Sequence, residues 1–88
     1  MEGIEVGTIV YSIKGRDSGR FFIVVEIVDD KYIKIADGEL RRIEKPKLKQ
    51  IKHVKTDGSS IPKLAVKLRE GAKIFNAEIR SSLRSFNA

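Results

Sequence analysis

The chain has 88 residues, 18 of them Lys or Arg and 12 Asp or Glu, which gives a net charge of +6 at pH 7. This length predicts one domain with a small core, and the absence of cysteine together with a single histidine argues against disulfides, zinc or any other bound cofactor. The acidic first residues do not look like a signal peptide and the longest apolar run, residues 21–25, is too short to cross a membrane, so we expect a cytoplasmic protein.

The first two thirds of the chain are rich in β-branched and aromatic residues, in short runs separated by turn residues. Strands are expected at residues 8–13, 20–28, 32–35, 40–43 and 50–55. The dipeptide Asp37-Gly38 is typical of a tight hairpin turn, and Pro46 ends the fourth strand because proline cannot donate to a ladder. Five short strands with tight turns favour a mainly β fold, a strongly bent sheet that closes into an SH3-like small barrel.

A glycine-rich loop connects the first two expected strands. It reads Gly15-Arg16-Asp17-Ser18-Gly19-Arg20. Glycine can adopt positive φ and lets another backbone come close, while the two arginines would face solvent. The loop therefore suits contact with phosphate, and a plain turn is the simpler alternative.

The whole positive excess lies between residues 41 and 55. Seven basic residues stand there against one acid, Glu44, and the charges of the remaining chain cancel. The seven are Arg41, Arg42, Lys45, Lys47, Lys49, Lys52 and Lys55. So concentrated a charge attracts a polyanion. The alternative is a solvated lysine-rich edge that prevents sheet-to-sheet aggregation.

Beyond a linker at residues 56–60, helix-forming residues replace the β-branched ones. Ser59 or Ser60 could cap a helix that has Pro62 in its first turn, and Gly71 would end it. Asn76 would be the N-cap of a second helix. One kinked helix through Gly71 is the alternative.

The second strand predicts a role for this tail, because the strand is apolar on both faces and a small barrel has one interior. The tail carries the apolar stripe Leu64, Leu68, Phe75, Ile79, Leu83 and Phe86. We expect residues 58–88 to pack on the outside of a barrel formed by residues 1–57, covering part of the second strand.

The order of these features resembles the KOW motif of ribosomal and transcription-elongation proteins. The matching features are Val6-Gly7, Val10, the loop from Gly15 to Arg20, Val24, Asp29-Asp30, Tyr32, Asp37-Gly38, Arg41-Arg42 and Lys52-His53. From about Glu5 to Val54 the chain is similar to KOW-domain relatives of the large-subunit ribosomal proteins of the "fourteen-e" kind. The resemblance implies an SH3-like barrel that binds RNA, usually ribosomal RNA. It maps the binding loop onto Gly15, Arg16, Gly19 and Arg20, and the basic segment onto Arg41, Arg42, Lys45, Lys47 and Lys49.

The sequence thus predicts a module that binds structured RNA, as part of the ribosome or near it, by contacting its phosphates. The expected contact residues are Lys14, Gly15, Arg16, Gly19, Arg20, Arg41, Arg42, Lys45, Lys47, Lys49, Lys52 and His53. Tyr11 and Tyr32 could stack on bases or pack a barrel end. The alternative is a protein-interaction module that uses the barrel or the C-terminal helices. We do not expect an enzyme, because His53 is the only imidazole and no spacing links it to a serine.

Overall fold

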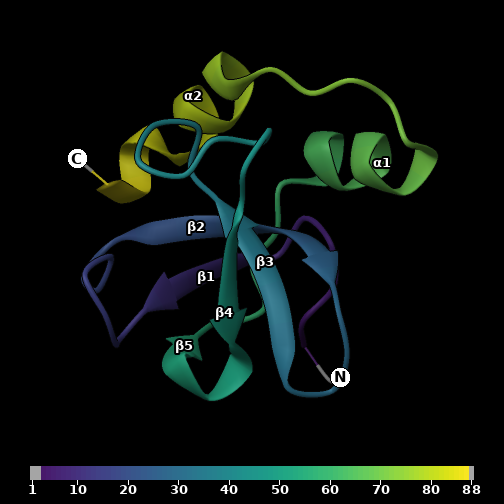
Figure 1. Ribbon diagram of the computed structural model, residues 1–88. Helices are drawn as coiled ribbons and strands as arrows, with labels where there is room; N and C mark the ends of the chain where they lie inside the picture. Colours follow the sequence, from purple (N-terminus) through teal and green to yellow (C-terminus); the bar gives the residue numbers. More distant parts are fainter. Residues whose placement is uncertain (1–2, 88) are drawn as a thin grey trace.

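The computed structural model, which describes residues 3–87, contains one antiparallel sheet followed by two helices (Figure 1). The strands are β1 (Ile9–Ser12), β2 (Phe21–Ile27), β3 (Tyr32–Ala36), β4 (Lys47–Gln50) and β5 (Val54–Lys55), in the spatial order β4-β3-β2-β1-β5. One turn of 3-10 helix, η1 (Ile51–His53), joins β4 to β5, and the helices are α1 (Pro62–Glu70) and α2 (Asn76–Asn87). The predicted number of strands, five, and the two C-terminal helices are confirmed. Within residues 3–87 no ladder joins β4 to β5, so the sheet is bent but open.

Two of the predicted strands are misplaced. Residues 40–43 do not form a strand, because the carboxylate of Asp37 accepts hydrogen bonds from the backbone N–H groups of Glu39 and Arg41 and closes the chain into a compact turn. The fourth strand is β4 instead, which begins just after Pro46 at the edge of the sheet, where a missing N–H is tolerated. The expected strand at residues 50–55 is interrupted by η1, which carries the chain from the β3 side of the sheet to the β1 side.

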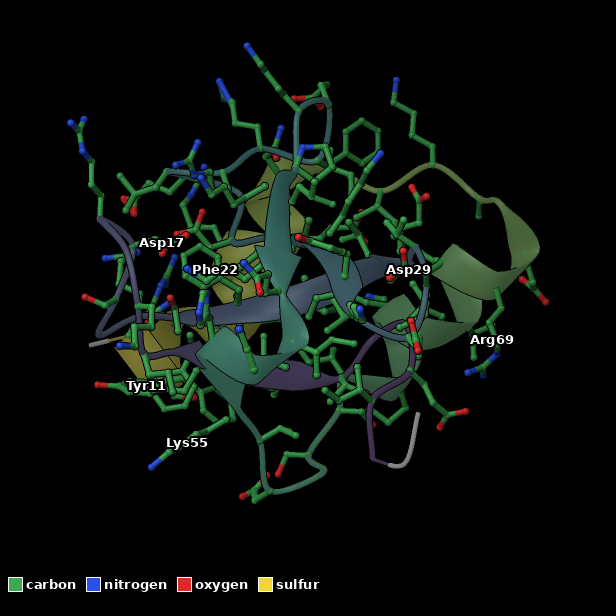
Figure 2. The ribbon with its side chains drawn as sticks, turned by 60° about the horizontal axis from the view of Figure 1, so that its bottom comes forward. Tyr11, Asp17, Phe22, Asp29, Lys55 and Arg69 are labelled. Carbon is green, nitrogen blue, oxygen red and sulfur yellow. The ribbon has the colours of Figure 1, made fainter. Side chains whose placement is uncertain are left out.

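The inner face of the sheet holds the first hydrophobic core. Phe22 and Val24 of β2, Ile33 and Ile35 of β3 and Val10 of β1 are fully buried there. In Figure 2, Phe22 lies between the strands, on the side of the molecule that carries Asp17. These residues alternate along their strands, as the period of two requires.

The outer face of the same strands holds a second core, and its cover comes from the tail. Sheet residues such as Ile9 and Ile23 pack there against residues of the tail. The buried tail residues of this core are Leu64, Ile74, Ile79 and Leu83. Figure 1 shows α1 and α2 lying over this one side of the sheet. Of the predicted apolar stripe, Phe75 is 57% exposed, whereas Phe86 packs on Phe21 with ring centroids 5.4 Å apart.

The two helices are separate, as predicted, and Gly71 ends α1 with a φ of 71°. The predicted serine cap is wrong. The residue before α1 is Ile61, and no side chain caps the helix. The backbone carbonyl of Ser59 instead accepts a hydrogen bond from the N–H of Ile9 at 2.8 Å, so the linker extends along β1. Within residues 3–87 neither helix is long and apolar enough to span a bilayer.

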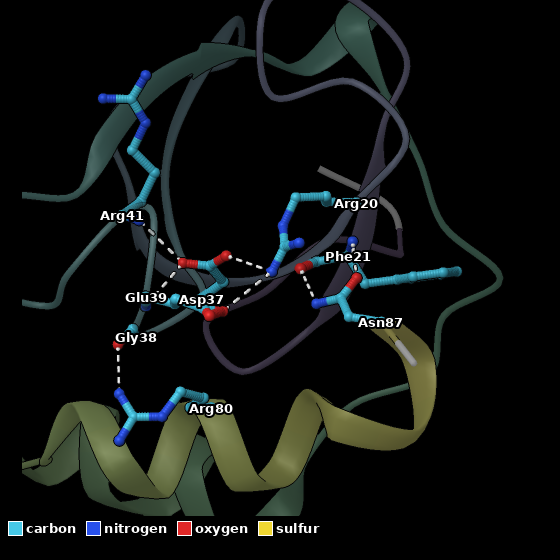
Figure 3. Close-up of polar contacts among 8 residues, drawn as sticks. All are labelled: Arg20, Phe21, Asp37, Gly38, Glu39, Arg41, Arg80 and Asn87. Carbon is cyan, nitrogen blue, oxygen red and sulfur yellow. Dashed lines mark hydrogen bonds and ion pairs between the residues drawn. The ribbon is translucent and has the colours of Figure 1, made fainter.

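Asparagines at both ends of α2 fasten it to the sheet region. Asn76 was expected to cap its own helix, but its Oδ1 accepts a hydrogen bond from the N–H of Ile43 at 2.8 Å. The Asn87 amide pairs with both backbone groups of Phe21, accepting from the N–H at 2.7 Å and donating to the carbonyl at 3.0 Å (Figure 3). Asn87 thus satisfies strand groups at the start of β2, and Asn76 satisfies an N–H of the connection between β3 and β4.

Gly38 makes the closest approach between the turn after β3 and α2. A Cβ on this residue would lie 2.3 Å from the carbonyl oxygen of Asn76, and its φ is +79°. We expect Gly38→Ala to destabilise the protein by about 2–4 kcal/mol, through positive φ and through the clash. Urea unfolding measures this. Gly58→Ala is the matched control, since Gly58 has a φ of +88° with nothing within 4 Å and should show only the smaller backbone cost. Equal losses in the two variants would contradict the close packing of α2.

Candidate nucleic-acid interface

A groove of about 450 Å³ lies between the glycine-rich loop and β4. The loop contributes Lys14 to Asp17, the turn after β3 contributes Arg41, and the whole of β4 forms the opposite wall. Tyr32 and His53 complete the lining. The fold therefore gathers seven of the twelve predicted contact residues in one hollow. They are Lys14, Gly15, Arg16, Arg41, Lys47, Lys49 and His53.

Lys49 has a different role from the one the sequence predicts. Its side chain is 6% exposed, and its Nζ lies 2.7 Å from Oδ1 of Asp17, which is equally buried. The same ammonium donates to the backbone carbonyl of Lys14, and the Ser12 hydroxyl donates to Asp17 at 2.9 Å. The charge of Lys49 is thus neutralised inside the protein, and the residue holds the loop against β4.

The ionisation of Asp17 follows from this environment. Burial by itself would raise the pKa of the carboxyl group. The hydrogen bonds from Lys49 and Ser12, together with the positive charge of Lys49, outweigh it and leave the pKa of Asp17 below its usual value. Asp17 is therefore a carboxylate at neutral pH, and the pair with Lys49 is ionic.

Four cations of the groove remain available to a ligand. Lys14 and Arg16 are exposed and Arg41 and Lys47 are half-buried. Among residues 3–87 none of the four makes an ion pair. Asp17 is the one acidic residue in the lining, and Lys49 neutralises it, so the groove has a net positive charge and would attract an anion.

Arg20, by contrast, lies outside the groove and is bound to acids. Its guanidinium is 3.2 Å from the buried carboxylate of Asp37 and 3.6 Å from that of Glu39. Figure 3 shows this cluster beside α2, with the side chain of Arg41 pointing away from it. Arg80 of α2 donates to the Gly38 carbonyl at 3.0 Å in the same region. Arg20 therefore stabilises the turn after β3.

The remaining predicted contact residues do not line the groove. Gly19 is at the far end of the loop with a φ of +86°, and Arg42, Lys45 and Lys52 are exposed on the surface. Arg16 and Lys47 thus share one surface, whereas Arg20 belongs to another. The basic residues form a groove with scattered neighbours and not one continuous stripe.

Sequence reasoning missed three of the groove residues, Asp17, Leu48 and Gln50. Asp17 gave a usable signal, because it is the one acid in a loop otherwise made of glycine, serine and arginine. Its partner Lys49 is 32 residues away, however, and only the fold brings the two together. Leu48, 51% exposed on an edge strand, gave no signal of its own.

Comparison with models of known protein families and with curated proteins gave no match for this chain.

Proposed function

We propose that this protein binds structured RNA, with ribosomal RNA as the expected kind, and that the groove between the glycine-rich loop and β4 is its main contact surface. The observation that carries the proposal is the convergence of Lys14, Arg16, Arg41 and Lys47 from three separate segments on one hollow. Cations spaced around a groove match the regular array of phosphates on a folded nucleic acid. The resemblance of residues 5–54 to the KOW motif supports RNA as the polyanion.

We further propose that the sheet is an SH3-like barrel of the KOW type. Support comes from the strand order and from the short η1 turn that carries the chain from one edge of the sheet to the other.

Binding would rely on charge and loop shape. The backbone of the loop is fixed by the Lys49–Asp17 pair, so Lys14 and Arg16 are presented without a large ordering cost. Arg41 and Lys47 would bind phosphates from the facing wall. We propose a binding role and not a catalytic one, since the groove has His53 as its one imidazole and its carboxylate is held by a lysine.

The salt dependence of RNA binding tests the proposal. Four phosphate contacts predict that affinity falls by about two orders of magnitude between 50 and 200 mM salt. In the double variant Arg16→Gln with Lys47→Gln, the slope of log K against log salt should fall by about 2. Fluorescence anisotropy with a labelled RNA hairpin measures both effects.

The matched control is Lys63→Gln with Arg69→Gln, which removes the same charge from exposed positions of α1. Figure 2 shows Arg69 on the opposite side of the molecule from Asp17. The control should keep the original slope. Equal losses in the two double variants would show that net charge alone drives binding. A flat salt dependence would reject the phosphate-binding groove and favour the protein-interaction alternative.

Crosslinking in cells, followed by sequencing of the attached RNA, tests the identity of the ligand. We expect ribosomal RNA to be enriched over messenger RNA, and the enrichment should disappear in the Arg16→Gln, Lys47→Gln variant.

A further inference from the structure

A second hollow, of about 520 Å³, lies directly beside the groove. It is lined by Asp30, Lys31, Tyr32, Gln50, Ile51 and Lys52. Tyr32 and Gln50, which are paired across β3 and β4, line both hollows. The two hollows are therefore neighbours at the end of the β3–β4 ladder, and a ligand in the groove can reach the second hollow past these two side chains.

Tyr32 is held in a defined position at this junction. Ile33 points into the inner core, so the half-buried side chain of Tyr32 leaves β3 on the opposite face. The N–H of Tyr32 donates to the Asp29 carboxylate at 2.8 Å, and its carbonyl accepts from the N–H of Val28 at 3.0 Å. The turn at residues 28–32 thus fixes the backbone that carries the aromatic ring.

The second hollow combines an aromatic ring with two lysines, and Asp30 is the one acidic residue in its lining. The N–H of Ile51 donates to the carbonyl of Lys31 at 2.8 Å, which brings the turn before β3 against η1. Lys31 and Lys52 are consequently both at the rim, exposed, and neither makes an ion pair within residues 3–87. The groove beside it is lined by basic residues, and Tyr32 is the one phenyl or phenol ring in its lining.

We propose that this hollow binds one unpaired nucleotide that flanks the paired RNA segment held in the groove. The base would stack on Tyr32 and contact Ile51, and its phosphate would lie between Lys31 and Lys52. Gln50 offers an amide that can donate to and accept from a base edge. The inference rests on the proposed RNA binding of the groove, and it adds that the preferred RNA has a helix with an unpaired nucleotide next to it.

The test uses two RNA hairpins that differ by one unpaired flanking nucleotide, 2-aminopurine, whose fluorescence falls when it stacks. We expect the hairpin with this nucleotide to bind about 5- to 150-fold more tightly than the blunt hairpin. Its fluorescence should change on binding. Tyr32→Leu should abolish both the gain and the fluorescence change, and Tyr32→Phe should retain them.

Tyr11→Leu is the matched control, because Tyr11 lies on β1 outside both hollows, and it should keep the gain. Melting curves identify any variant that fails to fold. Equal binding of the two hairpins, or a gain that survives Tyr32→Leu, would overturn the nucleotide site while leaving the groove intact. If neither hairpin binds, the proposed RNA binding itself is wrong and the nucleotide site is rejected with it.

Discussion

Deletion of residues 62–88 is expected to leave a chain that aggregates or is unfolded at room temperature. The deletion removes the buried side chains of Leu64, Ile74, Ile79 and Leu83 from the outer face of the sheet. Burial of each contributes roughly 1.5–3 kcal/mol, so the four together contribute about 6–12 kcal/mol. Small domains have a total stability of about 5–15 kcal/mol, and the loss is therefore of the same size as the whole.

Size-exclusion chromatography and thermal melting by circular dichroism measure this outcome. Residues 59–61 are kept in the shortened chain because they pair with β1. Phe75→Ser in the full chain is the control, since Phe75 is 57% exposed and should be replaceable at little cost. A shortened chain that stays monomeric with an unchanged melting temperature would show that the helices do not stabilise the sheet. They would then be better explained as a docking element for a partner protein.

Substitution of one partner in the Lys49–Asp17 pair is expected to be the most damaging change at the groove. Lys49→Met leaves a buried carboxylate without its counterion and should cost about 3–5 kcal/mol. The double variant Lys49→Met with Asp17→Asn should be more stable than Lys49→Met alone, because the asparagine oxygen can still accept from Ser12 without a buried charge. Urea unfolding of the two single variants and the double variant gives the coupling. If the loss of stability in the double variant equals the sum of the losses in the two single variants, the two residues are not coupled.

The Lys49–Asp17 pair also predicts that the stability of the protein depends on pH. The pKa of Asp17 is lower in the folded protein than the ordinary value of about 3.8, so the folded state favours the ionised form. Its contribution to the free energy of unfolding is complete above about pH 5 and is lost as the pH falls through the lowered pKa. Asp17→Asn should therefore lose less stability than the unaltered protein between pH 5 and pH 2. Parallel pH profiles for the two proteins would contradict the assignment.

The fold was largely predictable because the strongest signals are local. The apolar run of β2 indicated a strand, Gly71 indicated a helix end, and the two apolar faces of β2 indicated that a cover was needed. The misplaced strand at residues 40–43 shows the limit. Asp37 binds two backbone N–H groups of the turn, and this local competition outweighs the strand preference of Leu40 and Ile43.

The sequence predicted the positive charge of the candidate site but not the ion pairs that its basic residues make. Composition indicated a basic segment, yet Lys49 and Arg20 are both engaged by acids distant in the sequence, Asp17 and Asp37. Sequence alone gives no distance between such residues. It also could not show that Tyr32 lines two hollows, because Gln50 meets it only through the register of β3 and β4.

The sheet pairing of β1 has a consequence for the order of folding. Three hairpins, β1–β2, β2–β3 and β3–β4, join neighbouring strands and can form as soon as each has been synthesised. The other edge of β1 is completed only by distant segments. The Thr56 hydroxyl, which donates a hydrogen bond to the Ile9 carbonyl, is 47 residues away in the sequence. Asn87, which completes the edge at Phe21, is 66 residues away. During synthesis the apolar outer face of β2 therefore stays uncovered for several seconds, the period in which the nascent chain is most exposed to chaperones and to aggregation.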